Sequence, residues 1–574
     1  MSLLERIDAA SEPEIEQGKR LIRANDHGGP SLGNRMARGW NRWSWRMPLG
    51  RRLTIKLATV PKDPVAGDKT VGEALLHGHV VHGSEQLDLD SLDFARADLS
   101  PPMFDYLHSF AWLRDLAAAA TREKGGRLAE KLLHHWLDAC AADPDQPSWR
   151  SELWGRRILF WTAYAPFILS SRDAAYRSAL LTALARGARY VDRRADRAAA
   201  GVARITAWSG VVAAALLLEG GIVRYGRAEG GLLRALGEAL HEDGGLVSRS
   251  PDEQLALVEL LCQLRAIYIA GRRQMPERLQ DALSGSVGAL LGATLGDEAL
   301  SSWQGGNMLS QRRLAAAIEG SGVPARPLRQ PSGWGYQRLT ARSAIVILDG
   351  APPPPSRLFA GGCASTLAFE FSDGLSRLVV NCGGVGPWTG KLSPELAHAL
   401  RFTAAHSTLT LGDRNSTAIL DDGRLGKGVR QVEIVRDETG GTARIEGSHD
   451  GYVQRFGFTH QRLLNLGADG RELKGEDHLL SRRRKWRGDP IPFAARFHLG
   501  PGIEAATTAD GQGALLRVRG GNAWQFRCRG GKLDVEDSLW VDGTGRPRGT
   551  SQLVISGEAP PEGLALSWLF QRAA

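Results

Sequence analysis

Cysteine is scarce in this chain of 574 residues. The five cysteines are odd in number, widely spaced and include no Cys-x-x-Cys pair; they are Cys140, Cys262, Cys363, Cys382 and Cys528. This pattern excludes a zinc-finger framework, and it does not fit the dense disulfide framework of a small secreted domain.

Long apolar runs are also missing. The longest candidate, GVVAAALLLEGGIV at residues 210–223, is interrupted by Glu219 and two glycines. It falls short of the roughly 18 residues that a membrane span needs, so no transmembrane segment is predicted. The start, MSLLERIDAASEPEIEQGKR, is acidic and polar and lacks the basic start followed by an apolar core that a signal peptide has. These features predict a cytoplasmic protein.

Lysine is scarce as well. Only 11 of the 72 basic residues are lysine, against 63 acidic residues and a net charge of +9. Arginine suits a bidentate grip on carboxylate, sulfate or phosphate groups. The basic run SRRRKWRGD at residues 481–489 has no known nucleic-acid-binding module around it, so we interpret it as a solvated loop and expect no nucleic-acid partner.

Residues 96–325 have a helical pattern. Apolar residues recur at i, i+3, i+4 and i+7 in several segments of 14 to 22 residues. The clearest are residues 103–120, 127–142, 154–171, 174–194 and 253–270. Short polar connections indicate successive antiparallel helices, arranged either as a superhelix or as a closed α/α toroid.

The pattern changes after Pro324, Pro327 and Pro331. Short β-type runs then alternate with Gly or Asp turns, at residues 342–350, 365–374, 376–384, 406–413, 443–451 and 514–521. Asp349-Gly350 and Asp373-Gly374 indicate hairpin turns. We expect a multi-domain α+β chain with an N-terminal extension (1–95), a helical domain (96–325) and an antiparallel β-sandwich (326–574).

Several segments together resemble the heparinase II/III-like proteins, a bacterial family of polysaccharide lyases and lyase-like proteins. They are FDYLHSFAWLRDL (104–116), WGRRILFWTAYAPFI (154–168), HEDGGLVSRSP (241–251), SGWGYQRL (332–339), RFTAAHSTLTLGD (401–413) and residues 448–479. The resemblance runs from about residue 55 to the C-terminus. It implies an (α/α) toroid or incomplete barrel joined to a β-sandwich, with an acidic glycan bound in the cleft between them.

Lyases of this family cleave uronic-acid glycans by β-elimination. A base removes the proton on C5, a cationic or hydrogen-bonding group neutralises the neighbouring carboxylate, and an acid protonates the leaving oxygen. The resemblance places His406 at a site histidine, within AHST. Tyr336 in SGWGYQRL is the candidate general acid, although packing between the domains is the alternative for this ring.

The resemblance also implies a zinc site, and here the chain departs from the family. Cys363 stands where a ligand histidine is expected, Asn381 where the aspartate is expected, and Gly361 where the catalytic histidine is expected. Cys363, Asn381 and His406 are the candidate ligands of a structural zinc, although asparagine is a poor zinc ligand. No cofactor is required for the reaction.

Five further residues are candidates for substrate binding. Trp154 and Arg157 combine an aromatic ring and a cation on one helix, and Arg204 lies on an otherwise apolar helix; Arg249 and Arg401 lie in loop-like segments. The alternatives are a tryptophan-filled helix interface for Trp154 and Arg157, an internal ion pair for Arg204 and a helix cap for Arg401.

Two functions remain open from the sequence. One is a polysaccharide lyase that acts on an acidic polysaccharide or oligosaccharide. The other is a catalytically inactive glycan-binding or envelope-assembly protein with the same cleft, and the altered positions Gly361, Cys363 and Asn381 favour it. By resemblance to the family, the periplasm or cell envelope is the alternative location.

Overall fold

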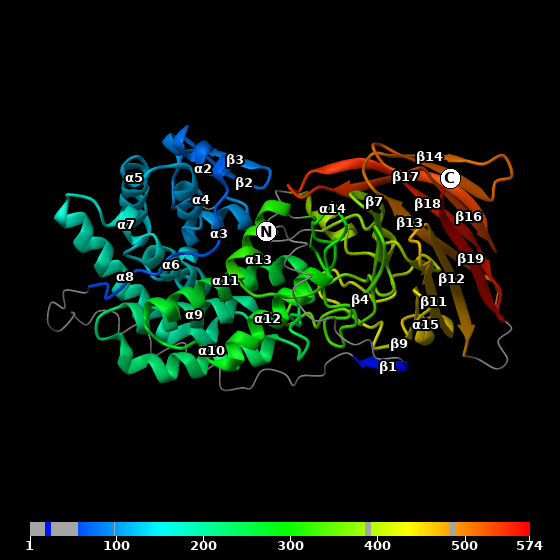
Figure 1. Cartoon of the computed structure of the whole chain (residues 1–574), viewed down its shortest axis with the longest axis horizontal. Helices are drawn as coiled ribbons and strands as arrows, with labels where there is room; N and C mark the ends of the chain where they lie inside the picture. Colours follow the sequence, from blue (N-terminus) through cyan, green and yellow to red (C-terminus); the bar gives the residue numbers. More distant parts are fainter. Residues whose placement is uncertain are drawn as a thin grey trace.

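The first half of the chain is helical, in agreement with its apolar spacing (Figure 1). The structure, a computed structural model, describes residues 18–23, 56–96, 98–306, 308, 310–384, 392–482 and 489–573. The helices of this half are α2 (Lys69–Leu76), α3 (Pro101–Ser109), α4 (Trp112–Ala119), α5 (Arg122–Cys140), α6 (Ser151–Ala163), α7 (Ala165–Ile168), α8 (Ala174–Arg194), α9 (Val202–Leu217), α10 (Tyr225–Ala239), α11 (Pro251–Ala270), α12 (Glu277–Gly292) and α13 (Gln311–Ser321).

Local sequence signals explain where these helices begin and end. Asp173 caps α8 because its carboxylate accepts hydrogen bonds from the backbone amides of Ala175 and Tyr176. Gly322 ends α13 in the left-handed conformation that glycine adopts without strain. None of the described helices is long and apolar enough to cross a membrane.

The helices α6 and α9 pack against each other at unusually close range. A Cβ atom on Gly155 of α6 would lie 2.3 Å from the carbonyl oxygen of Thr206 in α9. Only glycine fits this crossing, so it allows the two helices to approach closely. The helix α11 is buried along most of its length and contacts α9, α12 and α13.

The second half forms two antiparallel sheets, as the turn-punctuated β pattern predicts. The described strands of this half are β4 (Tyr336–Ala341), β5 (Ala344–Asp349), β6 (Phe369–Asp373), β7 (Ser376–Val380), β8 (Leu409–Leu411), β9 (Gln431–Thr439), β10 (Thr442–His449), β11 (Phe458–Leu466), β12 (Glu472–Ser481), β13 (Ile491–Leu499), β14 (Ile503–Thr507), β15 (Gly513–Val518), β16 (Trp524–Arg529), β17 (Lys532–Val541), β18 (Pro547–Ala559) and β19 (Gly563–Arg572). Two short helices, α14 (Pro394–Ala399) and α15 (Val453–Phe456), interrupt them.

The two sheets face each other across an aromatic core. One sheet has the order β1-β9-β10-β11-β12-β19-β16-β15-β14, and the other has the order β17-β18-β13-β7-β6-β5-β4, with β8 also paired to β13. Phe369 of β6 stacks on Trp568 of β19 with ring centroids 5.4 Å apart. This contact joins the two layers, so the arrangement is a β-sandwich.

The N-terminal region contributes to both halves. The strand β1 (Gly18–Arg23) pairs antiparallel with β9 and forms an edge of the sandwich (Figure 1). A small hairpin of β2 (His79–His82) and β3 (Glu85–Asp88) lies beside α2 and α3. Residues 1–17 and 24–55, and most of the basic run predicted as a loop at 481–489, lie outside the described residues.

Candidate functional site

Two arginine–carboxylate pairs, each with a buried arginine, join the helical half to the sandwich. Arg249, which lies just before α11, pairs with Asp349 at the end of β5. Arg377 of β7 donates to Asp297, in the loop after α12, from Nε at 2.7 Å and from Nη2 at 3.1 Å. The polar side chains of the junction are therefore fixed by contacts from both halves.

Asp349 is the centre of a hydrogen-bond network in this junction. Its side chain is fully buried, and its Oδ2 atom accepts from the Ser365 hydroxyl at 2.7 Å and from Nε2 of Gln304 at 3.4 Å. The Oε1 atom of Gln304 accepts from the backbone amide of Cys363 at 2.8 Å. The network thus connects Arg249 to the segment that would carry the family's catalytic histidine.

Tyr336 lies inside this junction, where its hydroxyl donates to the backbone oxygen of Arg249. Its ring stacks on Trp303 at 5.3 Å and is fully buried. Burial raises the pKa of the Tyr336 hydroxyl well above its ordinary value. The phenol proton is already used in an internal hydrogen bond, and this geometry fits the packing alternative for Tyr336.

Asn381 and His406 are also held by internal contacts. The Asn381 amide donates to Oε1 of Glu370 at 3.0 Å, and its Oδ1 atom accepts from the amide of Ser407 at 3.0 Å. Nδ1 of His406 lies 2.7 Å from the carbonyl oxygen of Phe402, which only a protonated Nδ1 can satisfy. Burial lowers the pKa of His406 to about 4, so the ring is neutral at neutral pH and a weak base.

The predicted zinc ligands do not form a converging donor set. Sγ of Cys363 lies 3.4 Å from the backbone oxygen of Gly361, and burial raises the pKa of the thiol to about 11. The side-chain amide of Asn381 already donates to Glu370 and accepts from the backbone amide of Ser407. Across the part of the chain that the structure describes, no group of three or more His, Cys, Asp or Glu side chains could hold a metal ion. These residues do not fit a zinc ion.

Arg401 borders a cavity of about 250 Å³ at the junction. Its Nε donates to the backbone oxygen of Gly362 at 2.8 Å, and its buried Nη2 has no hydrogen-bond partner among the described residues. Gly361 and His398 line the same cavity, together with Gly305, Pro394 and Ala397. An arginine that lines a cavity can bind a carboxylate or sulfate.

Trp154 and Arg157 lie in the interior of the helical half. Both side chains are fully buried, and the Arg157 guanidinium lies 4.1 Å from the ring centre of Trp136 and 4.3 Å from that of Trp154. It donates to the backbone oxygens of His108 and Ser148. This is the tryptophan-filled interface that the sequence left as the alternative, and neither side chain lines the junction cavity.

Arg204 is likewise held within the helical half. Its Nη1 pairs with Glu238 of α10 at 2.9 Å, and Nε and Nη2 donate to the carbonyl oxygen of Ala198. The structure therefore gathers Tyr336, Arg249, Cys363, Asn381, His406 and Arg401 around the junction, whereas the contacts of Trp154, Arg157 and Arg204 lie elsewhere.

Sequence reasoning missed three residues of the junction. Asp349 was interpreted as a hairpin turn, and this was wrong, because β5 leads into a long loop and the Asp349 carboxylate is buried. Asp373-Gly374 does connect β6 and β7 as a hairpin. Gln304 and His398 carried no motif signal, since each acts through contacts that only the fold creates.

The sequence matches a family model and a relative among known proteins. A family model described as "Heparinase II/III-like, C-terminal" matches residues 323–569. FtsZ-localized protein C of Caulobacter vibrioides is 30% identical over 551 residues, which cover 90% of each chain. This similarity spans the helical half as well as the sandwich.

Solved structures share the fold at low sequence identity. The crystal structure of heparinase III matches with a TM-score of 0.66 and 13% identity, covering 84% of this chain and 79% of that one. The heparan sulfate lyase HepC from Pedobacter heparinus matches with a TM-score of 0.57 and 13% identity, covering 88% of this chain and 82% of that one. The predicted combination of a helical toroid and a β-sandwich is confirmed. On the strength of the family model and the relative that matches along nearly its whole length, this chain belongs to the heparinase II/III-like family.

Proposed function

We propose that the chain binds an acidic, uronic-acid-containing glycan at the junction and does not cleave it. The observation that carries this proposal is the lining of the junction cavity, where Arg401 supplies a cation and Gly361 occupies the position at which the family resemblance predicts the catalytic histidine. A bound uronate would receive a charge-assisted hydrogen bond from Arg401.

Neither His406 nor Tyr336 is well suited to the proton transfers that β-elimination needs. His406 has a pKa of about 4, and a base that weak removes a carbon-bound proton inefficiently. Tyr336 is the other candidate acid or base, and its hydroxyl is buried and bonded to the backbone of Arg249. Binding without cleavage is the function that this arrangement supports best.

The test combines calorimetry with ultraviolet absorbance of the unsaturated uronyl product. Heparan sulfate, hyaluronan and alginate are each titrated into the full chain. We expect binding to at least one of them, a flat absorbance trace, and a loss of about tenfold or more in affinity in Arg401→Gln. Arg517→Gln, on an exposed surface pair, is the matched control and should bind as the wild type does.

Two outcomes would contradict the proposal. Absence of binding across the panel would reject the glycan ligand. A rise in absorbance that His406→Ala abolishes would instead establish a lyase, with His406 in its catalytic site.

We also propose that the chain localises with FtsZ. The relative named FtsZ-localized protein C supports this second proposal, because the similarity to it covers 90% of both chains. A fluorescent fusion in the native host is expected to co-localise with labelled FtsZ and to lose this pattern on depletion of FtsZ. A signal that does not follow labelled FtsZ would reject this proposal without affecting the first one.

A further inference from the structure

Another cavity lies within the helical half, where several helices begin close together. Its volume is about 250 Å³, and it shares no lining residue with the cavity at Arg401. Its walls come mainly from α3 and from the first two turns of α6, α9 and α11 (Figure 1). This volume is below the range typical of drug-sized ligands, so the cavity suits a smaller molecule.

Arg156 of α6 is a half-buried cation in this lining that the protein leaves without a counter-ion. No hydrogen bond or ion pair joins its guanidinium to the described residues. Two carboxylates influence it electrostatically, but each is already paired, Asp105 with Arg150 and Glu259 with Arg313. Burial lowers the pKa of Arg156, as expected for a cation that its surroundings compensate only in part.

Glu253 of α11 is the opposite case, an anion in the same lining without a cation. Among the described residues no lysine or arginine pairs with its carboxylate, and the Ser248 hydroxyl lies beside it. Burial raises the pKa of Glu253, because its charged form loses water without gaining a cation. The start of α11 favours a carboxylate at this position but does not neutralise it.

The other charges of the lining compensate one another. Asp105 and Glu152 both pair with Arg150, and the Glu152 carboxylate lies 3.5 Å from Nε of that arginine. The lining therefore holds one uncompensated charge of each sign, Arg156 and Glu253. An unpaired charge in a poorly solvated place is costly, and a bound counter-ion removes this cost.

Apolar surface separates the two uncompensated charges. Arg156 lies on α6 and Glu253 on α11, and α9 packs against both of these helices. The first turn of α9, which contributes Val202 and Ala203 to the lining, therefore lies between them. A ligand that meets both charges must carry its own charges at the two ends of an apolar spacer.

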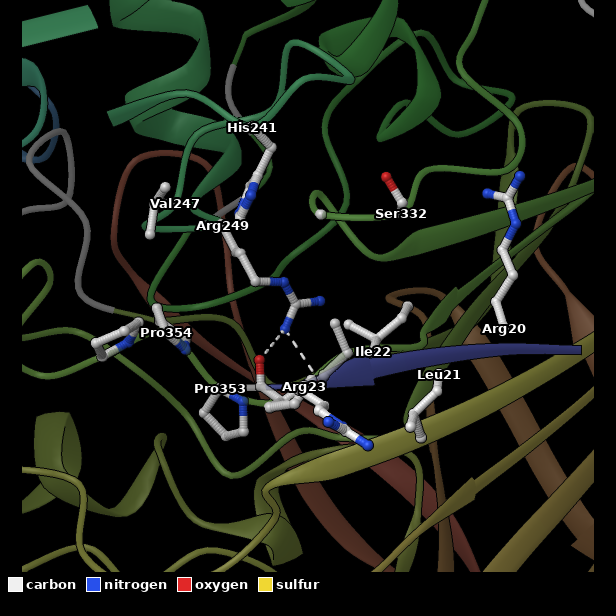
Figure 2. A pocket seen from close by; sticks show the side chains of 14 residues that line it. Arg20, Leu21, Ile22, Arg23, His241, Val247, Arg249, Ser332, Pro353 and Pro354 are labelled. Atoms are coloured by element: carbon white, nitrogen blue, oxygen red, sulfur yellow. Dashed lines mark hydrogen bonds between the residues drawn. The ribbon is translucent and has the colours of Figure 1, made fainter. Parts of the chain in front are cut away.

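A larger cavity beside β1, of about 440 Å³, does not offer this combination. Figure 2 shows Arg20 and Arg23 pointing apart, and the Arg249 guanidinium is used by Asp349 and by backbone oxygens. No Asp or Glu is present in its described lining. That cavity therefore has no anion to receive an ammonium group.

From these features we infer that the cavity between α6 and α11 binds a small zwitterion, an ω-amino carboxylic acid whose apolar spacer separates the carboxylate from the ammonium group. The carboxylate pairs with Arg156, the ammonium group pairs with Glu253, and the spacer lies on Val202 and Ala203. The ligand has no net charge, so it supplies both counter-ions without changing the charge of the site. This inference is independent of the glycan site.

The test uses four probes, each titrated into the full chain by calorimetry. 4-Aminobutyrate and 6-aminohexanoate carry both charges on spacers of different length, whereas hexanoate lacks the ammonium group and hexylamine lacks the carboxylate. We expect the better of the two zwitterions to bind about tenfold or more tightly than either single-charge probe. The difference between the two zwitterions identifies the spacer length that fits.

Two variants locate the site. Arg156→Gln and Glu253→Gln are each expected to weaken binding of the better zwitterion by about tenfold or more. Arg127→Gln and Glu123→Gln are the matched controls, because these residues form an exposed ion pair on α5 outside the cavity, and they should bind as the wild type does. Chemical denaturation of all four variants separates a lost contact from a lost fold.

A third variant separates this site from the glycan site. Arg401→Gln lies outside this lining, so it should bind the zwitterion as the wild type does whatever its effect on glycan binding. The inference is overturned if neither zwitterion binds, if the single-charge probes bind as tightly as the zwitterions, or if either Arg156→Gln or Glu253→Gln retains the full affinity.

Discussion

Asp349 and Arg249 form a buried ion pair across the boundary between the helical half and the sandwich. Their side chains are 0% and 3% exposed. Arg249 has a backbone φ of 56°, in the left-handed region that costs energy for a residue other than glycine. Its guanidinium also donates to three backbone oxygens, those of Trp334, Ala351 and Pro352. The sandwich thus holds in place the loop that leads into α11.

Asp349→Asn should destabilise the chain strongly. The change leaves the buried Arg249 cation without a carboxylate, which typically costs about 3–5 kcal/mol of the free energy of unfolding. Chemical denaturation measures the effect. Asp422→Asn, at an exposed pair with Arg424, is the control and should unfold like the wild type. Equal stability of the two variants would show that the pair does not hold the two halves together.

His406 should make stability fall in mild acid. Its pKa is about 4 in the folded chain and 6.5 in the reference state, so between these values the unfolded chain binds the proton and the folded chain does not. The free energy of unfolding therefore decreases as the pH falls from 6.5 toward 4, by up to about 3 kcal/mol for this group.

His406→Asn isolates this contribution, because the asparagine amide can still donate to Phe402. Denaturation across this pH range should show a shallower loss in the variant than in the wild type. His135→Asn, on the exposed side of α5, is the control. Identical pH profiles of wild type and His406→Asn would contradict the assignment.

Asn381→Asp, which introduces the aspartate that the family resemblance predicts at this position, should be destabilising. A carboxylate there would face Oε1 of Glu370, which now accepts from the Asn381 amide at 3.0 Å in a fully buried place. Two buried carboxylates cannot both ionise at that distance, so we expect a loss of at least about 2 kcal/mol at neutral pH.

Adding Glu370→Gln to that variant should restore most of the stability, because the new amide can donate to the new carboxylate. Thermal or chemical unfolding of the single and double variants measures this rescue. A single variant as stable as the wild type would mean that Glu370 does not impose the asparagine.

Chelation should leave the chain unchanged. Cys363, Asn381 and His406 are held by internal hydrogen bonds and do not converge as zinc ligands. We expect less than one zinc per chain by elemental analysis and the same melting temperature with and without EDTA. A fall in melting temperature that zinc reverses would restore the zinc prediction made from the family resemblance.

The fold could be predicted from the sequence because its signals are local and repeated. Apolar spacing identifies helices such as α8 and α11, and Gly or Asp turns identify strands such as β6 and β7. The strand β1 was not predicted, since its six residues pair with β9 more than 400 positions further along the chain. A pairing at that separation leaves no periodic trace in either segment.

The candidate site was less predictable, because one composition fits two environments. Trp154 and Arg157 have the residue types of a sugar-binding cleft, and the same types fill an interior in which a guanidinium stacks on indoles. Asp349 followed by glycine has the composition of a turn, yet its carboxylate is the centre of the junction network. In both cases burial decides the role, and burial depends on distant parts of the chain.

Arg157→Lys separates these two roles for the buried arginine. Lysine keeps the charge, but it cannot reproduce the paired donation to the His108 oxygen or lie flat between Trp136 and Trp154. We expect a loss of at least about 2 kcal/mol in the free energy of unfolding, since hydrogen bonds from a charged group are lost in the interior. Binding of the panel of acidic glycans should be unchanged, because Arg157 does not line the cavity at Arg401. Unchanged stability together with lost glycan binding would instead make Arg157 a substrate-binding residue, and would require the helical half to open when the glycan binds.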